Sequence, residues 1–87
     1  MNCYNLMGIV IGKRCENAVK VQEILTKYGC IIKVRLGLHE SNDNVCSQDG
    51  FIVLQLCGSK DEISNLCGEL NSIKGVTADI VTIEAKE

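Results

Sequence analysis

The sequence predicts a single α+β domain over residues 1–87, with the ferredoxin-like βαββαβ order. The expected sheet is antiparallel, in strand order 4-1-3-2, with two helices on one face. Three observations lead to this prediction. Four short apolar stretches have strand character, and two amphipathic stretches have helical periodicity. Each half of the chain also repeats the order strand, glycine, helix, glycine, strand.

The predicted strands are 5–11, 30–38, 51–57 and 76–83. In the first, the run Met7–Gly12 is apolar on both faces, and the third is apolar except for Gln55. Both patterns are expected of central strands, which is where the topology places them. The second strand alternates, with Val34 and Leu36 on one face and Arg35 on the other, as in an edge strand with one wet face.

The first predicted helix begins at residue 15 or 16, ends at Tyr28 and is stopped by Gly29. The second begins at Ser59, which forms a Ser-x-x-Glu capping box with Glu62, and closes at Lys74-Gly75. The polar stretch 39–49 is expected to be a long hairpin loop between the second and third strands.

The composition argues against several classes of function. The formal net charge is −2 and the nine Lys and Arg residues form no run, which argues against direct nucleic-acid binding. No apolar stretch approaches the ~18 residues of a membrane span, and no leader sequence is recognised. A cytoplasmic location without membrane association is therefore expected. The six cysteines include no Cys-x-x-Cys motif and are expected to be reduced and mostly structural.

The predicted helices can cover only one face of the sheet, whereas both central strands carry apolar residues on the second face as well. An apolar sheet face of this size is rarely left exposed to solvent. The sequence therefore predicts a homo-oligomer, either a dimer or a tetramer, with a different protein partner as an alternative occupant of that face.

The apolar and glycine positions form a series that covers nearly the whole chain. It comprises Gly8-Ile9-Val10-Ile11, Ala18-Val19-Lys20-Val21, Ile24-Leu25, Tyr28-Gly29, Val34-Arg35-Leu36-Gly37-Leu38, Gly50-Phe51-Ile52-Val53-Leu54, Asp61-Glu62-Ile63 and Leu70 to Gly75-Val76. The series resembles a small bacterial family, the regulators of the iron-only hydrogenase system. The resemblance implies an ACT-like fold, similar to the ligand-binding domain of nickel-responsive repressors. It also implies a non-enzymatic regulatory domain that binds a small effector at an oligomer interface.

The chain departs from this family after Leu38, and it also differs from the nickel-responsive repressors. Leu38 leads into His39, where family members often have proline. The chain has a single histidine, so it does not support nickel sensing of the histidine-rich type.

Five residues are candidates for effector binding. The resemblance places the effector site at the turn Gly12-Lys13-Arg14, and the free N–H groups at the start of the following helix could receive a carboxylate or a phosphate. Arg35, with Gly37 two residues later, could bind an anion or a neighbouring subunit. An ordinary turn and an exposed cross-strand ion pair are the alternatives at these two places, and both are the commoner arrangement.

His39 and Cys46 are the only pair in the sequence that resembles metal ligands, and two ligands make a site only if an oligomer supplies the others. Cys15 follows Lys13 and Arg14 at the start of a helix, where thiolate formation is favoured. A metal- or redox-responsive sensor that uses these residues is therefore the alternative function. No resident cofactor is predicted, and no arrangement of nucleophile and base or of paired carboxylates indicates catalysis.

Overall fold

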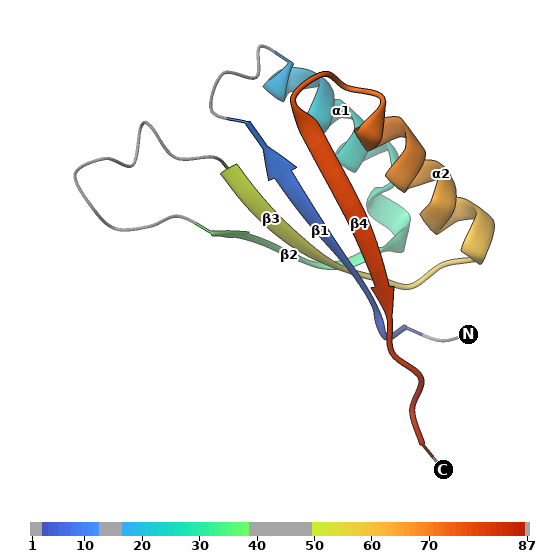
Figure 1. Cartoon of the computed structure of the whole chain (residues 1–87). Coiled ribbons are helices and arrows are strands. Elements are labelled where there is room, and N and C mark those ends of the chain that lie inside the picture. The colour runs from blue at the N-terminus through green and yellow to red at the C-terminus, as the bar shows by residue number, and fades with distance from the viewer. Residues whose placement is uncertain (1–2, 13–16, 39–49, 87) are drawn as a thin grey trace.

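The computed structural model describes residues 3–12, 17–38 and 50–86. Its elements are β1 (Asn5–Ile11), α1 (Ala18–Lys27), the short 3-10 helix η1 (Gly29–Ile31), β2 (Ile32–Leu38), β3 (Gly50–Leu56), α2 (Lys60–Asn71) and β4 (Val76–Thr82). The four strands form one antiparallel sheet in the order β2-β3-β1-β4, and both helices lie on one face of it (Figure 1). The predicted ferredoxin-like fold and strand order are confirmed.

One apolar core lies between the helices and the sheet. In β1 and β3, alternate residues such as Met7, Ile9 and Leu54 are fully buried, because they face the helices. The helices contribute their apolar stripes, including Val21 from α1 and Leu66 from α2. Among the described residues, no helix is long and apolar enough to cross a membrane.

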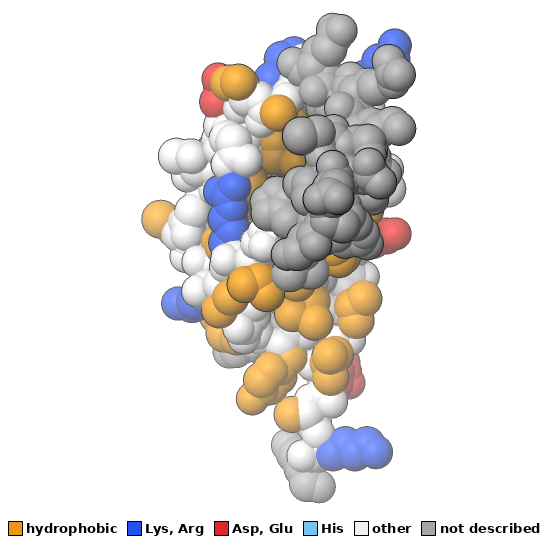
Figure 2. Space-filling view, turned by 90° about the vertical axis from the view of Figure 1, so that its left-hand side faces the viewer, with side chains coloured by type: hydrophobic (Ala, Val, Ile, Leu, Met, Phe, Trp, Pro, Cys, Tyr) orange, Lys and Arg blue, Asp and Glu red, His pale blue; other side chains and the backbone are white. Residues whose placement is uncertain are grey.

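The opposite side of the sheet, which we call the outer face, carries apolar side chains that no helix covers. Its exposed large residues are Leu6, Val10, Val34, Leu36, Phe51 and Val81. The strand register places them side by side across the sheet, with Val10 opposite Phe51 and Leu6 opposite Val81. Figure 2, which looks at the molecule from the side away from the helices, shows apolar side chains gathered in the lower half of this view.

The alternation in β2 marks its two faces correctly, but the apolar face is not the buried one. Leu36 lies opposite Val53 on the outer face and is about half exposed, whereas Arg35 lies opposite the buried Leu54 on the helix side. An edge strand beyond the reach of the helices is not forced to bury its apolar side. The expected wet face of this strand is therefore its inner face.

Two predicted boundaries are corrected. The second strand begins at Ile32 rather than residue 30, because the Ile31 N–H bonds to the Tyr28 carbonyl at 3.1 Å and turns the chain into η1. The second helix ends at Asn71, short of the predicted Lys74-Gly75, and a tight turn follows in which Gly75 has φ of 88°. The predicted start of the first helix at 15 or 16 and the loop 39–49 lie outside the described residues.

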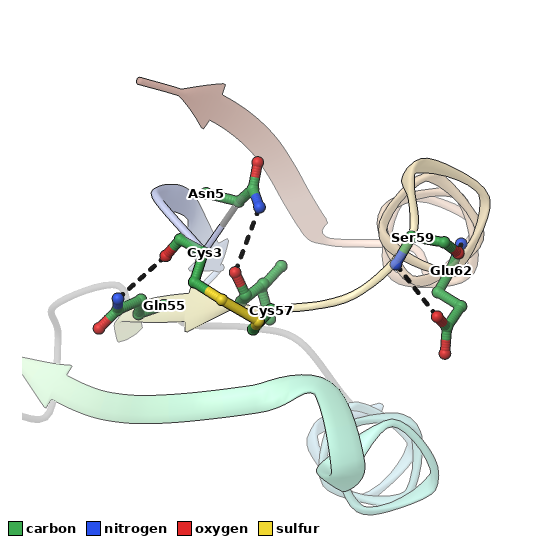
Figure 3. Close-up of a disulfide and its surroundings, with 7 residues drawn as sticks. Cys3, Asn5, Gln55, Cys57, Ser59 and Glu62 are labelled. Carbon is green, nitrogen blue, oxygen red and sulfur yellow. Dashed lines mark hydrogen bonds between the residues drawn. A yellow bond between two sulfur atoms is a disulfide. The ribbon is translucent and has the colours of Figure 1, made fainter. Parts of the chain in front are cut away.

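The expectation that the cysteines are reduced is wrong for one pair. Cys3 and Cys57 form a disulfide across 54 residues of sequence, with their Cα atoms 4.4 Å apart (Figure 3). The pairing of Asn5 with Leu56 brings them together, because each cysteine lies just beyond that pair. Cys30 and Cys67 are free thiols. Cys15 and Cys46 lie outside the described residues.

Candidate effector-binding cleft

A cleft of about 260 Å³ opens between α1 and the β2–β3 side of the sheet, at the end of β1 that leads towards the first helix. Its lining residues are Ile11, Gln22, Arg35, Gly37, Gly50, Phe51 and Ile52. Two of the five residues predicted to bind an effector, Arg35 and Gly37, are brought together here. The volume lies just below the usual range for small-molecule sites.

Arg35 provides the cation of this cleft. Its Nη2 group donates a hydrogen bond to Oε1 of Gln22, which α1 holds above the edge of the sheet. The partner is a neutral amide, so the contact orients the guanidinium without neutralising its charge. Among the described residues, Arg35 has no carboxylate partner, so the commoner alternative of a cross-strand ion pair is not what the structure shows.

Gly37 and Gly50 leave the walls of the cleft without side chains. Among the described residues, a Cβ added at Gly37 would find no atom within 4 Å, whereas one added at Gly50 would lie 3.7 Å from Cβ of Ile11. The space beside Arg35 is thus open at Gly37 and closed by an apolar residue at Gly50. An arginine beside open space and aliphatic walls suits a small molecule with one anionic group and an apolar body.

The other predicted turn residues have different positions. The Gly12 N–H donates to the Gly75 carbonyl at 2.8 Å, and a Cβ at Gly12 would approach that oxygen to 3.3 Å. Gly12 therefore fastens the end of β1 to the turn before β4, next in sequence to the cleft residue Ile11. Lys13 and Arg14 lie outside the described residues, as do the metal candidates His39 and Cys46. The described residues contain no group of three or more His, Cys, Asp or Glu that could hold a metal ion.

Sequence reasoning missed a second, larger cleft, of about 520 Å³, between the start of α1 and the end of α2. It is lined by Asn17, Lys20, Glu23, Ile24, Ser72, Ile73 and Lys74. Both signs of charge occur in its wall, so its charges favour no single class of ligand. The helical spacing of Lys20 and Glu23 places them on one face, but only the packing of two distant segments forms the cleft.

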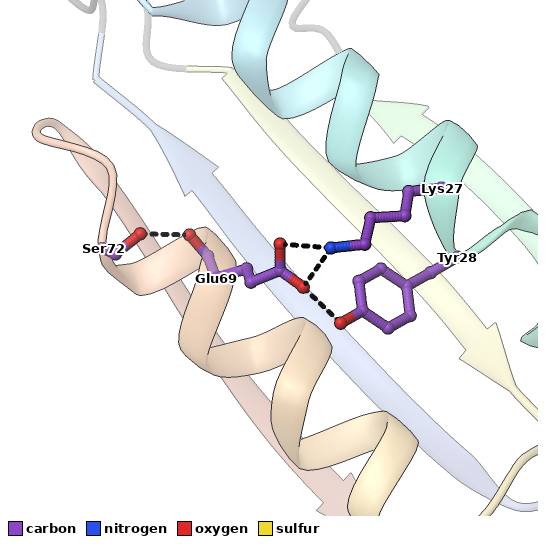
Figure 4. Close-up of polar contacts among 4 residues, drawn as sticks. All are labelled: Lys27, Tyr28, Glu69 and Ser72. Atoms are coloured by element: carbon purple, nitrogen blue, oxygen red, sulfur yellow. Dashed lines mark hydrogen bonds and ion pairs between the residues drawn. The ribbon is translucent and has the colours of Figure 1, made fainter.

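A polar cluster joins the two helices and was also not predicted. Glu69 on α2 accepts hydrogen bonds from Lys27 Nζ at 3.0 and 3.2 Å and from the Tyr28 hydroxyl (Figure 4). The Tyr28 hydroxyl, followed by Lys27, lowers the pKa of the Glu69 carboxyl. The same contacts with Glu69 raise the pKa of both Lys27 and Tyr28. The cluster fixes the end of α1 against α2.

Together, the fold and the cleft define a small α+β domain in which one arginine lines an open cleft beside an edge strand. Residues 4–79 match the family model described as "TM1266-like: Iron-only hydrogenase system regulator, putative". The chain belongs to this family of iron-only hydrogenase system regulators.

Two solved structures are similar to this chain. Protein TM1266 of Thermotoga maritima is 28% identical, with a TM-score of 0.78 over 92% of this chain and 95% of that one. A formyltetrahydrofolate deformylase from Pseudomonas putida KT2440 matches with a TM-score of 0.56 at 10% identity, over 91% of this chain and 28% of the deformylase. At that identity, the second likeness shows the shared fold alone.

Proposed function

We propose that this regulator-family chain is a non-enzymatic domain that binds a small anionic effector in the cleft between α1 and the β2–β3 edge. The observation that carries the proposal is the Arg35 guanidinium, oriented by the neutral Gln22 and facing open space at Gly37. A carboxylate is the group that this arrangement suits best, because a guanidinium can bind it with two parallel hydrogen bonds. Gly12, Lys13 and Arg14 are proposed to complete the site.

The polar side chains of the cleft support a binding function rather than catalysis. Among the described residues, Arg35 and Gln22 are the only polar side chains that line it. Neither a permanently charged guanidinium nor an amide can act as a general base or as a nucleophile at neutral pH. Binding and orientation of an anion are what these two groups can provide.

We further propose that the domain is a homo-oligomer that assembles through its outer face and the neighbouring edge of β2. Leu36 and Val34 on that edge strand are 53% and 49% exposed, and they continue the apolar surface of the central strands. The opposite edge differs, because the Asn71 side chain occupies both backbone hydrogen-bonding groups of Ala78 on β4. This occupied position favours extension of the sheet at β2 rather than at β4. Since the cleft borders β2, it would lie beside the subunit interface.

Titration calorimetry with a ligand panel tests the binding site. The probes are aliphatic amino acids, their 2-oxo acids and inorganic phosphate, each added to the full chain. We expect a carboxylate with an aliphatic body to bind the natural protein, and Arg35→Met to weaken it by roughly 10-fold or more, since a charge-assisted hydrogen bond is lost. Lys33→Met is the matched control, because Lys33 is exposed on the same strand and does not line the cleft. Equal affinity in both variants, or no binding by any probe, would refute the site.

Light scattering on the same samples tests the assembly. We expect the natural chain to exceed the monomer mass, and Leu36→Lys to shift it to monomer by placing a charge on the outer face. Val19→Lys is the control, because Val19 is an apolar residue that is 69% exposed on α1, away from the sheet. A natural chain that remains monomeric at micromolar concentration would contradict the oligomer and leave the binding result standing.

A further inference from the structure

The disulfide lies at the end of the sheet away from both clefts, where neither the core nor the proposed effector site uses it. Cys3 precedes β1 and Cys57 follows β3, and these two strands are antiparallel neighbours. Both cysteines are partly exposed, and neither belongs to the buried apolar cluster. The pair is therefore within reach of small thiols and disulfides in solution.

The backbone positions of both cysteines are held by contacts other than the sulfur–sulfur bond. Gln55 Nε2 donates to the Cys3 carbonyl at 3.0 Å (Figure 3). The Cys57 N–H donates to the Ile31 carbonyl at 2.8 Å. These hydrogen bonds do not require the disulfide, so the two thiols would stay adjacent after reduction. Their proximity then makes re-oxidation an intramolecular step with a high effective concentration.

We propose that Cys3 and Cys57 form a reversible dithiol–disulfide site that exchanges electrons with small-molecule disulfides and thiols. In the oxidising direction, one cysteine thiolate attacks a sulfur of oxidised glutathione and releases one glutathione thiolate, which leaves a mixed disulfide on the protein. The second cysteine thiolate then attacks the protein sulfur of the mixed disulfide and releases the second glutathione. Two protein thiols are oxidised, one disulfide of glutathione is reduced, and two glutathione thiols are formed.

The site controls how firmly the segment before β1 is attached to the sheet. The Tyr4 carbonyl, next to Cys3, accepts a hydrogen bond at 2.9 Å from the N–H of Ile83, which follows β4. Tyr4 and Ile83 are 55% and 54% exposed and extend the apolar surface at this end of the molecule. Oxidation tethers this corner covalently to β3, and reduction leaves it to hydrogen bonds. Redox state would thus set the order of an exposed apolar corner.

Differential alkylation tests the site. The full chain is equilibrated without oxygen in glutathione buffers of increasing oxidised fraction, quenched with acid, alkylated and analysed by peptide mass spectrometry. We expect Cys3 and Cys57 to lose reactivity together in one two-electron transition, with a loss of two hydrogens, about 2 Da, from the linked peptides. The free thiols Cys30 and Cys67 are internal controls that stay outside this linkage. Burial raises the pKa of the Cys67 thiol, so it is expected to be the slower of these two to react.

Three outcomes would overturn the proposal. Cys3 and Cys57 could stay reduced, and so be fully alkylated, even in the most oxidising buffer. They could stay linked by the disulfide in the most reducing buffer. They could also form disulfides with other cysteines instead of with each other. Cys57→Ser should abolish the transition, and Cys30→Ser should preserve it.

Hydrogen exchange on the natural chain supplies a readout that needs no variant. We expect the amides near residues 3–5 to exchange roughly 10-fold faster after reduction, while those of α2 stay unchanged. Equal exchange in both states would contradict the tether.

Discussion

The two βα halves of this domain share a topology but differ in how their helices are fastened. In the second half, Ser59 and Glu62 form a complete capping box at the start of α2, with both hydrogen bonds at 3.1 Å. At its end, Asn71 bonds to both backbone groups of Ala78, at 2.8 and 2.9 Å. In the first half, Asn17 makes no side-chain capping bond at the start of α1. The second half therefore has the better anchored helix.

This difference separates the anchored half from the half that carries the candidate site. Both clefts border α1, and a side-chain hydrogen bond between Gln22 and Arg35 joins α1 to β2. Elements that bind ligands are commonly drawn from the less stable parts of a fold. The repeated topology gives one half a helix anchored by side-chain hydrogen bonds, and it leaves the polar groups of the cleft accessible in the other.

The largest difference in stability between the two halves is expected when the side chains that anchor each helix are removed. Asn71→Ala leaves the N–H of the buried Ala78 without its partner, and leaves its carbonyl with only the Cys67 thiol at 3.5 Å. We expect this to lower the free energy of unfolding by about 1–3 kcal/mol. Gln22→Ala removes the corresponding exposed contact of the first half and should cost less than about 0.5 kcal/mol. Urea unfolding monitored by circular dichroism measures both. Equal losses would show that the halves are equally fastened.

The helix starts offer a smaller and closely matched test. Ser59→Ala removes a hydroxyl that accepts from the Glu62 N–H, and we expect a loss of about 1 kcal/mol. Asn17 occupies the equivalent position at the start of α1, but its side chain makes no capping bond. The effect of Asn17→Ala on the free energy of unfolding should therefore be close to zero. The same urea titrations serve here, and a comparable loss from Asn17→Ala would reveal a cap that the structure does not contain.

The sequence predicted the elements of both halves because their signals are local. Strand 5–11 follows from apolar residues on both faces, and its observed bounds, Asn5–Ile11, are those predicted. The capping box follows from the spacing of Ser59 and Glu62, and the structure confirms it. The strand order followed from matching the two doubly apolar strands to the two central positions of the sheet.

The contacts of the candidate site and the disulfide could not be predicted, because they join residues far apart in the sequence. Arg35 and Gly37 were identified, but their partner Gln22 lies 13 residues away from Arg35 on a helix. The disulfide depends on a strand register that places Cys3 next to Cys57. The buried side of β2 was also beyond prediction, since alternation distinguishes two faces without telling which one the helices cover.

The smallest expected effect concerns the polar cluster in which Lys27 and Tyr28 contact Glu69 on α2. The Tyr28 hydroxyl and Lys27 hold the pKa of Glu69 below its ordinary value of 4.5, so ionised Glu69 favours the folded state. This contribution is present above the ordinary pKa and is lost as the pH falls through the lowered value. We therefore expect the natural chain to lose more stability than Glu69→Gln between pH 7 and pH 3, measured by urea unfolding. Glu84→Gln, in the exposed segment after β4, is the control and should behave like the natural chain.

Because the Tyr28 hydroxyl is the larger cause of the shift, Tyr28→Phe should remove more of this pH dependence than Lys27→Met. If Lys27→Met removes more, the ion pair rather than the tyrosine joins the loosely capped helix to the firmly capped one.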